Sequence, residues 1–209
     1  PRQWVKNVLV VAAPAAAGSL FQPAVALNTL GAFVAFCLVS ASIYLINDVR
    51  DVEADRLHPK KRFRPIAAGE LTARTALVLA AITVVASLAL GAAIAPQLAA
   101  TLATYWVLQV GYSLFLKNQP IIDLAVVASG FLLRAVAGGV ASDIALSQWF
   151  LLVAAFGSLF MVAGKRYAEL NELGGEAQTR ATLEEYSIGY LRMLLTISPA
   201  ADLISSCAW

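Results

Sequence analysis

The chain has 209 residues, of which 60% are hydrophobic and 13% are charged, and its formal net charge is +2. A soluble domain carries about twice that share of charged residues, so the composition excludes an ordinary soluble globular protein. Because thirteen acidic and fifteen basic residues nearly balance, we expect no nucleic acid among its partners.

The histidine and cysteine content excludes several site types. His58 is the only histidine, which rules out any mechanism that requires two, and we expect it to be a loop residue. Cys37 and Cys207 each lie within apolar sequence and show neither metal-ligand nor disulfide spacing. We therefore expect both cysteines to be small packing residues.

Long apolar segments predict an all-α, polytopic transmembrane helix bundle that forms a single membrane domain over residues 1–209. No charged residue occurs between Leu9 and Leu45 or between Ala76 and Leu116. Such stretches are typical of membrane-spanning helices, which need about 20 residues each. Pro14 lies inside the first span and predicts a kink there. The predicted spans, about seven in all, cover residues 7–22, 25–46, 74–94, 97–116, 120–140, 147–164 and 188–209.

The basic residues predict the orientation of the bundle. Apart from Arg134 within the fifth span and Arg192 near the start of the seventh, they occur at the N-terminus and in the connections after spans 2, 4 and 6, whereas the opposite turns contain none. By the positive-inside rule, the basic side is cytoplasmic, which predicts a multi-pass protein of the bacterial inner membrane. Two connections on that side, at about 47–73 and 165–187, are long enough to be functional loops. The basic residues of that side are Arg2, Lys6, Arg50, Arg56, Lys60, Lys61, Arg62, Arg64, Arg74, Lys117, Lys165, Arg166 and Arg180.

An acidic cluster, N-D-x-x-D-x-x-x-D, follows the second span. On a continuous helix, Asp48, Asp51 and Asp55 fall within roughly a 60° arc. Oxygen ligands of this kind suit Mg²⁺, which one or two carboxylates usually hold together with substrate phosphates. The segment therefore predicts a metal–diphosphate site at the mouth of the bundle; the alternative is a solvated helix end paired with Arg56. The predicted metal ligands are Asn47, Asp48, Asp51 and Asp55.

Basic residues in three places are candidate phosphate ligands. A juxtamembrane cluster can also bind anionic lipid headgroups, and this alternative stays open for residues 60–64. Lys165, Glu169 and Glu172 share one helical stripe, although a basic helix C-terminus is a simpler interpretation of that segment. Residues 2–7 form either part of the site or a membrane anchor. The predicted substrate-binding residues are Lys6, Asn7, Arg56, Lys60, Lys61, Arg62, Arg64, Lys165, Arg166, Tyr167 and Glu169.

Two charged residues lie within or beside the fifth span. Arg134 lies about 20 Å along the helix, and an ionisable residue at such depth is a functional candidate. Asp143 lies about 2.5 turns further on and is a candidate structural partner for Arg134. Asp123 lies near the start of the same span, and the sequence alone assigns it no role.

The apolar span, the acidic cluster and the following Arg64-Pro65-x-x-x-Gly69 together resemble the UbiA superfamily of intramembrane prenyltransferases. The resemblance implies that Asn47, Asp48, Asp51 and Asp55 bind a Mg²⁺-diphosphate at the cytoplasmic mouth of a nine-helix bundle. It also implies that the chain is truncated, with about two helices missing at the C-terminus.

The second loop departs from the pattern of family members that act on aromatic acceptors, because Lys165-Arg166-Tyr167 stands where those members carry a second aspartate-rich motif. Together with the motifs at residues 2–7 and 60–65, this segment resembles the decaprenyl-phosphate phosphoribosyltransferase branch. That resemblance implies transfer of 5-phosphoribose from phosphoribosyl pyrophosphate to a polyprenyl phosphate, with catalysis by Asp48, Asp51 and Asp55. The alternatives are prenyl transfer to an aromatic acceptor and, outside enzymes, a transporter or a lipid-binding membrane protein. Transporter coupling sites usually lie near the membrane midplane, whereas this cluster lies at the surface.

Overall fold

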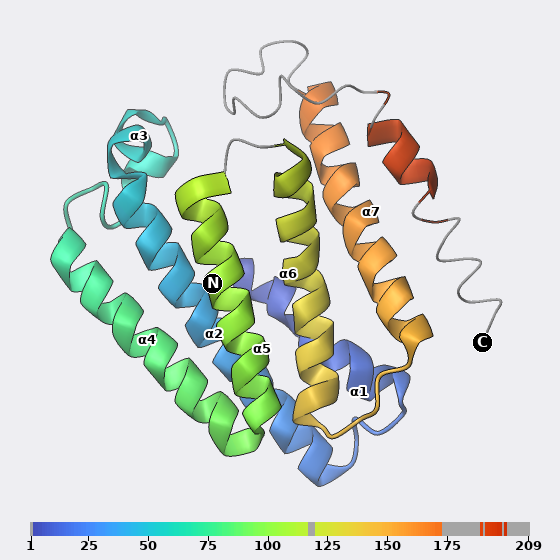
Figure 1. The fold of residues 1–209 in the computed structure, drawn as a ribbon. Coiled ribbons are helices and arrows are strands. Elements are labelled where there is room, and N and C mark those ends of the chain that lie inside the picture. The colour runs from blue at the N-terminus through green and yellow to red at the C-terminus, as the bar shows by residue number, and fades with distance from the viewer. Residues whose placement is uncertain (1, 117–119, 173–188, 190, 198, 200–209) are drawn as a thin grey trace.

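The computed structural model describes residues 2–116, 120–172, 189, 191–197 and 199, and the elements of this part of the chain are helical. Five longer helices run alternately up and down (Figure 1). They are α2 (Pro23–Arg50), α4 (Ala73–Ile94), α5 (Pro96–Gly111), α6 (Pro120–Ala141) and α7 (Gln148–Glu172).

Local sequence signals start these helices where they begin. Proline occupies the first turn of α2 and of α5, where its missing N–H group is not needed. The Thr72 hydroxyl caps α4 by accepting a hydrogen bond from the Thr75 N–H at 3.2 Å. At the start of α7, the Ser147 hydroxyl accepts from the Phe150 N–H at 3.1 Å. Proline, threonine and serine residues in the connections therefore determine where these helices begin.

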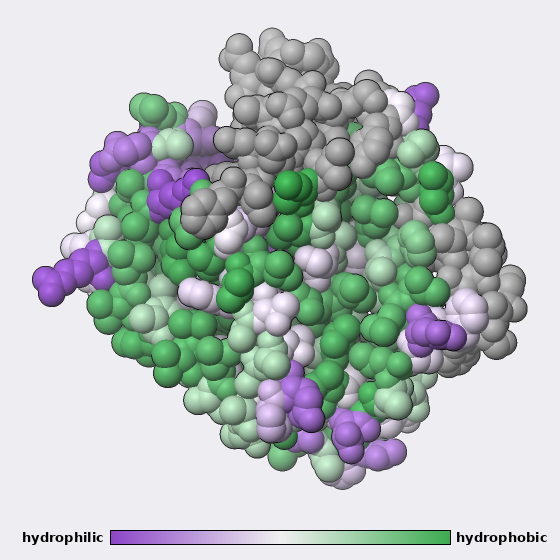
Figure 2. Space-filling view, viewed as in Figure 1, coloured by the Kyte–Doolittle hydropathy of each residue, from purple (hydrophilic) through white to green (hydrophobic). Residues whose placement is uncertain are grey.

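Four of the described helices are long and apolar enough to cross a membrane: α2, α4, the part of α6 from Ile122, and α7 as far as Ala168. Large hydrophobic side chains such as Ile82 and Val85 of α4 are exposed on the outside of the bundle. In Figure 2, green hydrophobic residues cover the middle of the visible face, and hydrophilic residues lie towards its ends. The chain is a multi-pass membrane protein, as predicted.

The first predicted span, 7–22, is wrong in its bounds and in its helix type. The chain forms a 3₁₀ helix, η1 (Arg2–Val11), which passes into the short helix α1 (Ala12–Ala16). Gly18, with φ of +64°, then turns the chain before residue 22, a conformation that glycine adopts at no steric cost. An apolar window over 7–22 does not register this turn. Most of the seventh predicted span, 188–209, lies outside the described residues, although 191–197 are helical.

The bundle packs around two buried clusters. The larger joins α2, α5, α6 and η1; in it, the Phe36 and Tyr105 rings lie 5.3 Å apart, beside Leu98 and Leu102. The smaller joins α6, α7 and the helical residues after 190, around Leu124 and Val162. The helices are therefore held in fixed positions around the charged side chains between them.

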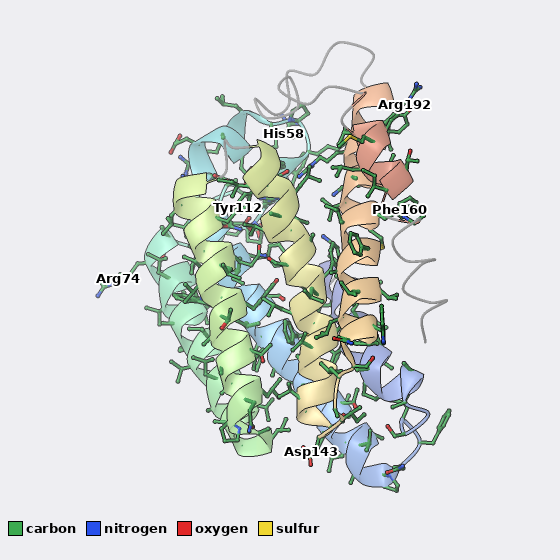
Figure 3. The ribbon with its side chains drawn as sticks, turned by 45° about the vertical axis from the view of Figure 1, so that its right-hand side comes forward. His58, Arg74, Tyr112, Asp143, Phe160 and Arg192 are labelled. Carbon is green, nitrogen blue, oxygen red and sulfur yellow. The ribbon has the colours of Figure 1, made fainter. Side chains whose placement is uncertain are left out.

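The basic connections lie together at one end of the bundle. The connection between α2 and α4 carries α3 (Val52–Leu57) and the 3₁₀ turn η2 (Lys61–Phe63). Figure 3 shows His58 and Arg192 at that end and Asp143 at the other. We call the end with His58 the basic end. The carboxyl ends of α2, α5 and α7, from which the predicted loops start, lie at the basic end (Figure 1), whereas residues 117–119 and 173–187 of those loops lie outside the described residues.

Candidate active site

The aspartate-rich segment is broken into two helices. α2 ends at Arg50, Asp51 leaves helical geometry with φ −91° and ψ 9°, and α3 begins at Val52. The Asp51 N–H still bonds to the Asn47 carbonyl at 2.9 Å, and the Asp55 N–H bonds to the Asp51 carbonyl at 2.8 Å. The single continuous helix assumed from the sequence is therefore wrong, because the chain changes direction at Asp51.

Asp48 and Asp55 nevertheless converge on one point. One nitrogen of the Arg64 guanidinium, Nη1, donates to Asp48 Oδ1 and to Asp55 Oδ2, at 2.8 Å in each case. Lys61 Nζ lies 4.0 Å from the other oxygen of Asp55. Asp55 is buried, whereas Arg64 and Asp48 keep side-chain exposures of 39% and 23%. The cluster is thus a pair of facing carboxylates with a cation between them, open to water on one side.

The side chains of the acidic cluster fit a metal ion only in part. In the described part of the chain, no group of three or more His, Cys, Asp or Glu side chains is arranged to hold a metal. The Asn47 side-chain oxygen accepts a short hydrogen bond from the Ser113 hydroxyl. Two convergent carboxylates still match the usual Mg²⁺ arrangement, in which phosphates supply the other ligands. Within the predicted set of four ligands, Asp48 and Asp55 are the pair that shares a hydrogen-bond donor, Arg64. The metal role of all four residues stays a prediction.

Other side chains of the first loop form hydrogen bonds within the loop and not with Asp48 or Asp55. Arg56 pairs with Glu53 at 2.9 Å and donates to the Ala67 carbonyl at 3.4 Å, so it braces the loop rather than the carboxylates. His58 Nδ1 accepts the backbone N–H groups of Lys60 and Lys61 at 3.1 and 3.3 Å, which confirms its loop role.

Arg62 and Lys60 are solvent-exposed. The Arg62 guanidinium stacks over the Phe63 ring at 4.8 Å. Within the predicted clamp, only Arg64 and Lys61 contact the acidic pair.

The side chain of Arg166, which was predicted to bind phosphate, pairs with a carboxylate of the protein. It forms a buried ion pair with Asp123 of α6, with Nε and Nη2 at 3.0 and 2.7 Å from Asp123 Oδ2. The Tyr112 hydroxyl donates a short hydrogen bond to the other oxygen of Asp123. No role for Asp123 was predicted from the sequence. The signal that could have indicated one is a lone carboxylate at the basic end of a span, four residues after Gln119.

The other residues predicted around the second loop lie at the end of α7. Lys165 is solvent-exposed, and the Tyr167 hydroxyl accepts from Arg192 Nε at 3.3 Å. The side chain of Glu169 and residues 173–187 of the predicted loop lie outside the described residues.

The predicted partnership of Arg134 with Asp143 is wrong. Arg134 is buried, and it donates to the Asn7 side-chain oxygen at 2.8 Å, the Gly130 carbonyl at 2.6 Å and the Tyr105 hydroxyl at 2.8 Å. Asp143 instead forms a left-handed turn with φ 53° at the opposite end of the bundle. Helical spacing alone did not reveal that η1 and α5 supply the partners.

Asn7 and Lys6, predicted together as substrate ligands, lie in different environments. Asn7 is fully buried and also donates to Cys37 Sγ at 3.3 Å, so it is a packing contact between helices. Lys6 is solvent-accessible. Partial burial, followed by the positive charges of Lys165 and Arg134, lowers the pKa of the Lys6 ammonium. The positive charges of α6 and α7 therefore act on Lys6 of η1.

A π-helical turn, η3 (Tyr112–Leu116), connects the two charged regions. Tyr112 bonds to Asp123, Ser113 bonds to Asn47, and the Leu114 carbonyl accepts from Arg50 at 3.1 Å. In Figure 3, Tyr112 lies below His58, further from the basic end. Single π turns inside α-helices frequently occur at functional sites. The turn thus ties the end of α2 to the start of α6.

Comparisons with known proteins agree on one family. The model of the UbiA prenyltransferase family matches residues 8–170. Decaprenyl-phosphate phosphoribosyltransferases are similar over 100% of this chain: that of Mycolicibacterium smegmatis is 54% identical, that of Corynebacterium glutamicum 52%, and that of Mycobacterium tuberculosis H37Rv 50%. The chain spans 67%, 64% and 71% of these three relatives.

One solved structure has a similar fold. It comes from work on digeranylgeranylglyceryl phosphate synthase in membranes, and it superimposes with a TM-score of 0.75 at 18% identity. The alignment covers 97% of this chain and 70% of that chain. At this identity, the likeness concerns the fold alone.

Proposed function

Because the chain belongs to the UbiA prenyltransferase family, we propose that it transfers 5-phosphoribose from phosphoribosyl pyrophosphate to a polyprenyl phosphate such as decaprenyl phosphate. Pyrophosphate is released, and the product is a precursor of cell-wall arabinan. The observation that carries this proposal is the 50 to 54% identity, over the whole chain, to relatives named for this activity.

The proposed reaction needs little acid–base chemistry from the protein. The lipid phosphate is already an ionised nucleophile, so its oxygen attacks C1 of the ribose while the bond from C1 to the pyrophosphate oxygen breaks. Catalysis then depends on positioning and on stabilising the charge of the leaving group. The lone His58, whose ring caps a loop, is consistent with a mechanism that uses no histidine base.

The acidic pair supplies the proposed leaving-group site. Asp48 and Asp55 would hold Mg²⁺, which when bound neutralises the charge that develops on the departing pyrophosphate. Arg64 already bridges these carboxylates, and its partial exposure lets it exchange a carboxylate for a phosphate oxygen. Lys61 adds a second cation beside Asp55. Asn47 and Asp51 support the segment at the helix break.

Lys6 and Lys165 are the proposed ligands for a second phosphate, either the 5-phosphate of the donor or the lipid phosphate. Both are solvent-accessible, and their charges interact. Two neighbouring ammonium groups repel one another unless an anion lies between them. We also propose that the basic end faces the cytoplasm of a bacterial plasma membrane, where soluble donor and lipid acceptor meet.

The test is a transfer assay with purified full-length protein in lipid nanodiscs. Radiolabelled phosphoribosyl pyrophosphate and decaprenyl phosphate should yield a labelled lipid in the presence of Mg²⁺, and excess EDTA should abolish it. Transfer that continues at full rate in EDTA would rule out the metal role. A prenyl diphosphate with an aromatic acceptor is the parallel reaction; product there, and none from the ribose donor, would establish the alternative function instead.

A further inference from the structure

Two residues of η1 that lie three apart, Asn7 and Val10, are buried, and Ala13 of α1 continues this face. Val5 and Val8 of η1 are 71% and 54% exposed. In a 3₁₀ helix, residues three apart lie directly above one another. The winding therefore presents one continuous buried face through Asn7 and Val10, and it sets the direction in which Lys6, the neighbour of Asn7, leaves the helix.

Two contacts with α6 fix that face. Arg134 Nε donates to the Asn7 side chain at 2.8 Å, and Gly138 lets the Val10 carbonyl approach so closely that a Cβ at position 138 would lie 1.8 Å from its oxygen. Three residues of a 3₁₀ helix rise about 6 Å, and four residues of an α-helix also rise about 6 Å. The 3₁₀ winding thus matches the spacing of the two α6 anchors, and an α-helical η1 would not.

Arg134 is itself held rigidly. The Tyr105 hydroxyl and the Gly130 carbonyl accept two of its other N–H groups, and its guanidinium lies 4.8 Å from the Tyr105 ring centroid. Asn7 is consequently hydrogen-bonded to a partner that contacts from α5 and α6 keep in place.

An arginine is an expensive choice for a purely structural tether. In the described part of the chain, no carboxylate pairs with Arg134, although a buried unpaired charge costs several kcal/mol. A neutral glutamine could donate a hydrogen bond to Asn7 without that cost. The charge is useful if an anion binds nearby. Lys6, the neighbour of Asn7, has a pKa that is lowered first by burial and then by the positive charges of Lys165 and Arg134.

We propose that Arg134 is a positioning residue for the phosphate site: through Asn7 it fixes the rotation of η1 and directs Lys6 toward Lys165. The inference rests on the proposed phosphoribosyl transfer for its kinetic test. Lys6 contacts the substrate phosphate, and Arg134 acts on it through Asn7.

The test is a double-mutant cycle in the full-length protein with Asn7→Ala, Lys6→Met and the double variant. KM is measured for both substrates separately from kcat. If Asn7 acts by placing Lys6, each single variant raises KM for the same substrate about tenfold, as the loss of one charge-assisted hydrogen bond predicts. The double variant is then within about twofold of either single variant. Independent effects, which multiply to about a hundredfold, overturn the proposal.

Two further variants serve as controls for the double-mutant cycle. Arg74→Gln removes an exposed cation that projects outward from α4 (Figure 3), and it should leave both KM values unchanged. Arg134→Lys keeps the charge but replaces the fork of N–H groups with an ammonium, so it should raise the same KM as Asn7→Ala. If Asn7→Ala is not recovered as folded protein, Asn7→Ser replaces it in the cycle.

A readout without substrate separates this proposal from the proposed function. The pKa of Lys6 is measured by NMR of ¹³C-methylated lysines, assigned with Lys6→Arg, in protein that still melts cooperatively. Asn7→Ala leaves every charge in place, so a rise of the Lys6 pKa toward its ordinary value reports displacement of η1. An unchanged pKa overturns the positioning role. Absence of phosphoribosyl transfer by the wild-type protein would overturn the proposed function alone.

Discussion

Two aspartate–arginine pairs of this protein have nearly the same bond lengths and opposite surroundings. Arg64 binds Asp48 at 2.8 Å with side-chain exposures of 39% and 23%, whereas Arg166 binds Asp123 at 2.7 Å with exposures of 7% and 2%. Water can compensate an exposed pair that opens, but a buried pair that opens leaves an unpaired charge in the bundle. The first pair is therefore suited to exchanging partners with a ligand, and the second to holding α6 and α7 together.

The largest expected effect follows from removing a carboxylate of the exposed pair. Asp48→Asn should lower turnover by about 10²–10³-fold, the size expected when one group that stabilises developing charge is lost. The thermal midpoint should change little, because the position is partly solvated. Glu53→Gln, in the same segment but paired with Arg56 at the surface, is the matched control and should retain activity. Equal losses in both variants would contradict the assignment of the site.

The buried pair should respond in the opposite way. Asp123→Asn leaves Arg166 without its charge partner and should lower the free energy of unfolding by about 3–5 kcal/mol. The measurement is thermal denaturation in nanodiscs, with Asp143→Asn as a control in an exposed turn at the other end. A variant with wild-type stability and strongly raised KM would instead place Arg166 among the substrate ligands.

Lys6 gives a prediction with opposite signs for function and stability. Its pKa is lowered from the ordinary value near 10.5, so affinity for the phosphate substrate should fall as pH rises through the lowered value. Because the lysine has a lower pKa in the folded protein than in the unfolded chain, folding is most favourable at a pH above the ordinary lysine pKa. This contribution to the free energy of unfolding is lost as the pH falls through the folded-state pKa. At neutral pH, Lys6→Met should therefore raise the thermal midpoint slightly while weakening binding and removing its pH dependence.

The smallest effect is expected at the exposed part of the basic run. Arg62 stacks on Phe63 away from the carboxylates, so Arg62→Gln should change kcat/KM by less than about threefold. Arg64→Gln, two residues on, should reduce kcat/KM much more because Arg64 binds both carboxylates. Equal reductions of kcat/KM in the two variants would mean that residues 60–64 act as a general positively charged surface, as in binding to lipid headgroups.

The sequence predicted those features that depend on neighbours along the chain. Apolar length located α2, α4, α6 and α7, and the spacing of Asp48 and Asp55 anticipated their convergence even though the helix breaks at Asp51. It did not predict the Arg166–Asp123 pair or the Arg134–Asn7 pair. These two pairs join residues that are 43 and 127 positions apart. Such pairs form only when helices pack, and helical spacing within one segment carries no information about them.

The five-residue turn at Tyr112–Leu116 holds one residue more than ordinary α-helical winding would require. Deleting one residue there would restore regular winding and rotate the side chains of η3 that follow the deletion by about 100°. The Tyr112 and Ser113 hydroxyls could then no longer reach both Asp123 and Asn47. The winding of η3 is therefore constrained to the residue, in contrast to most surface connections.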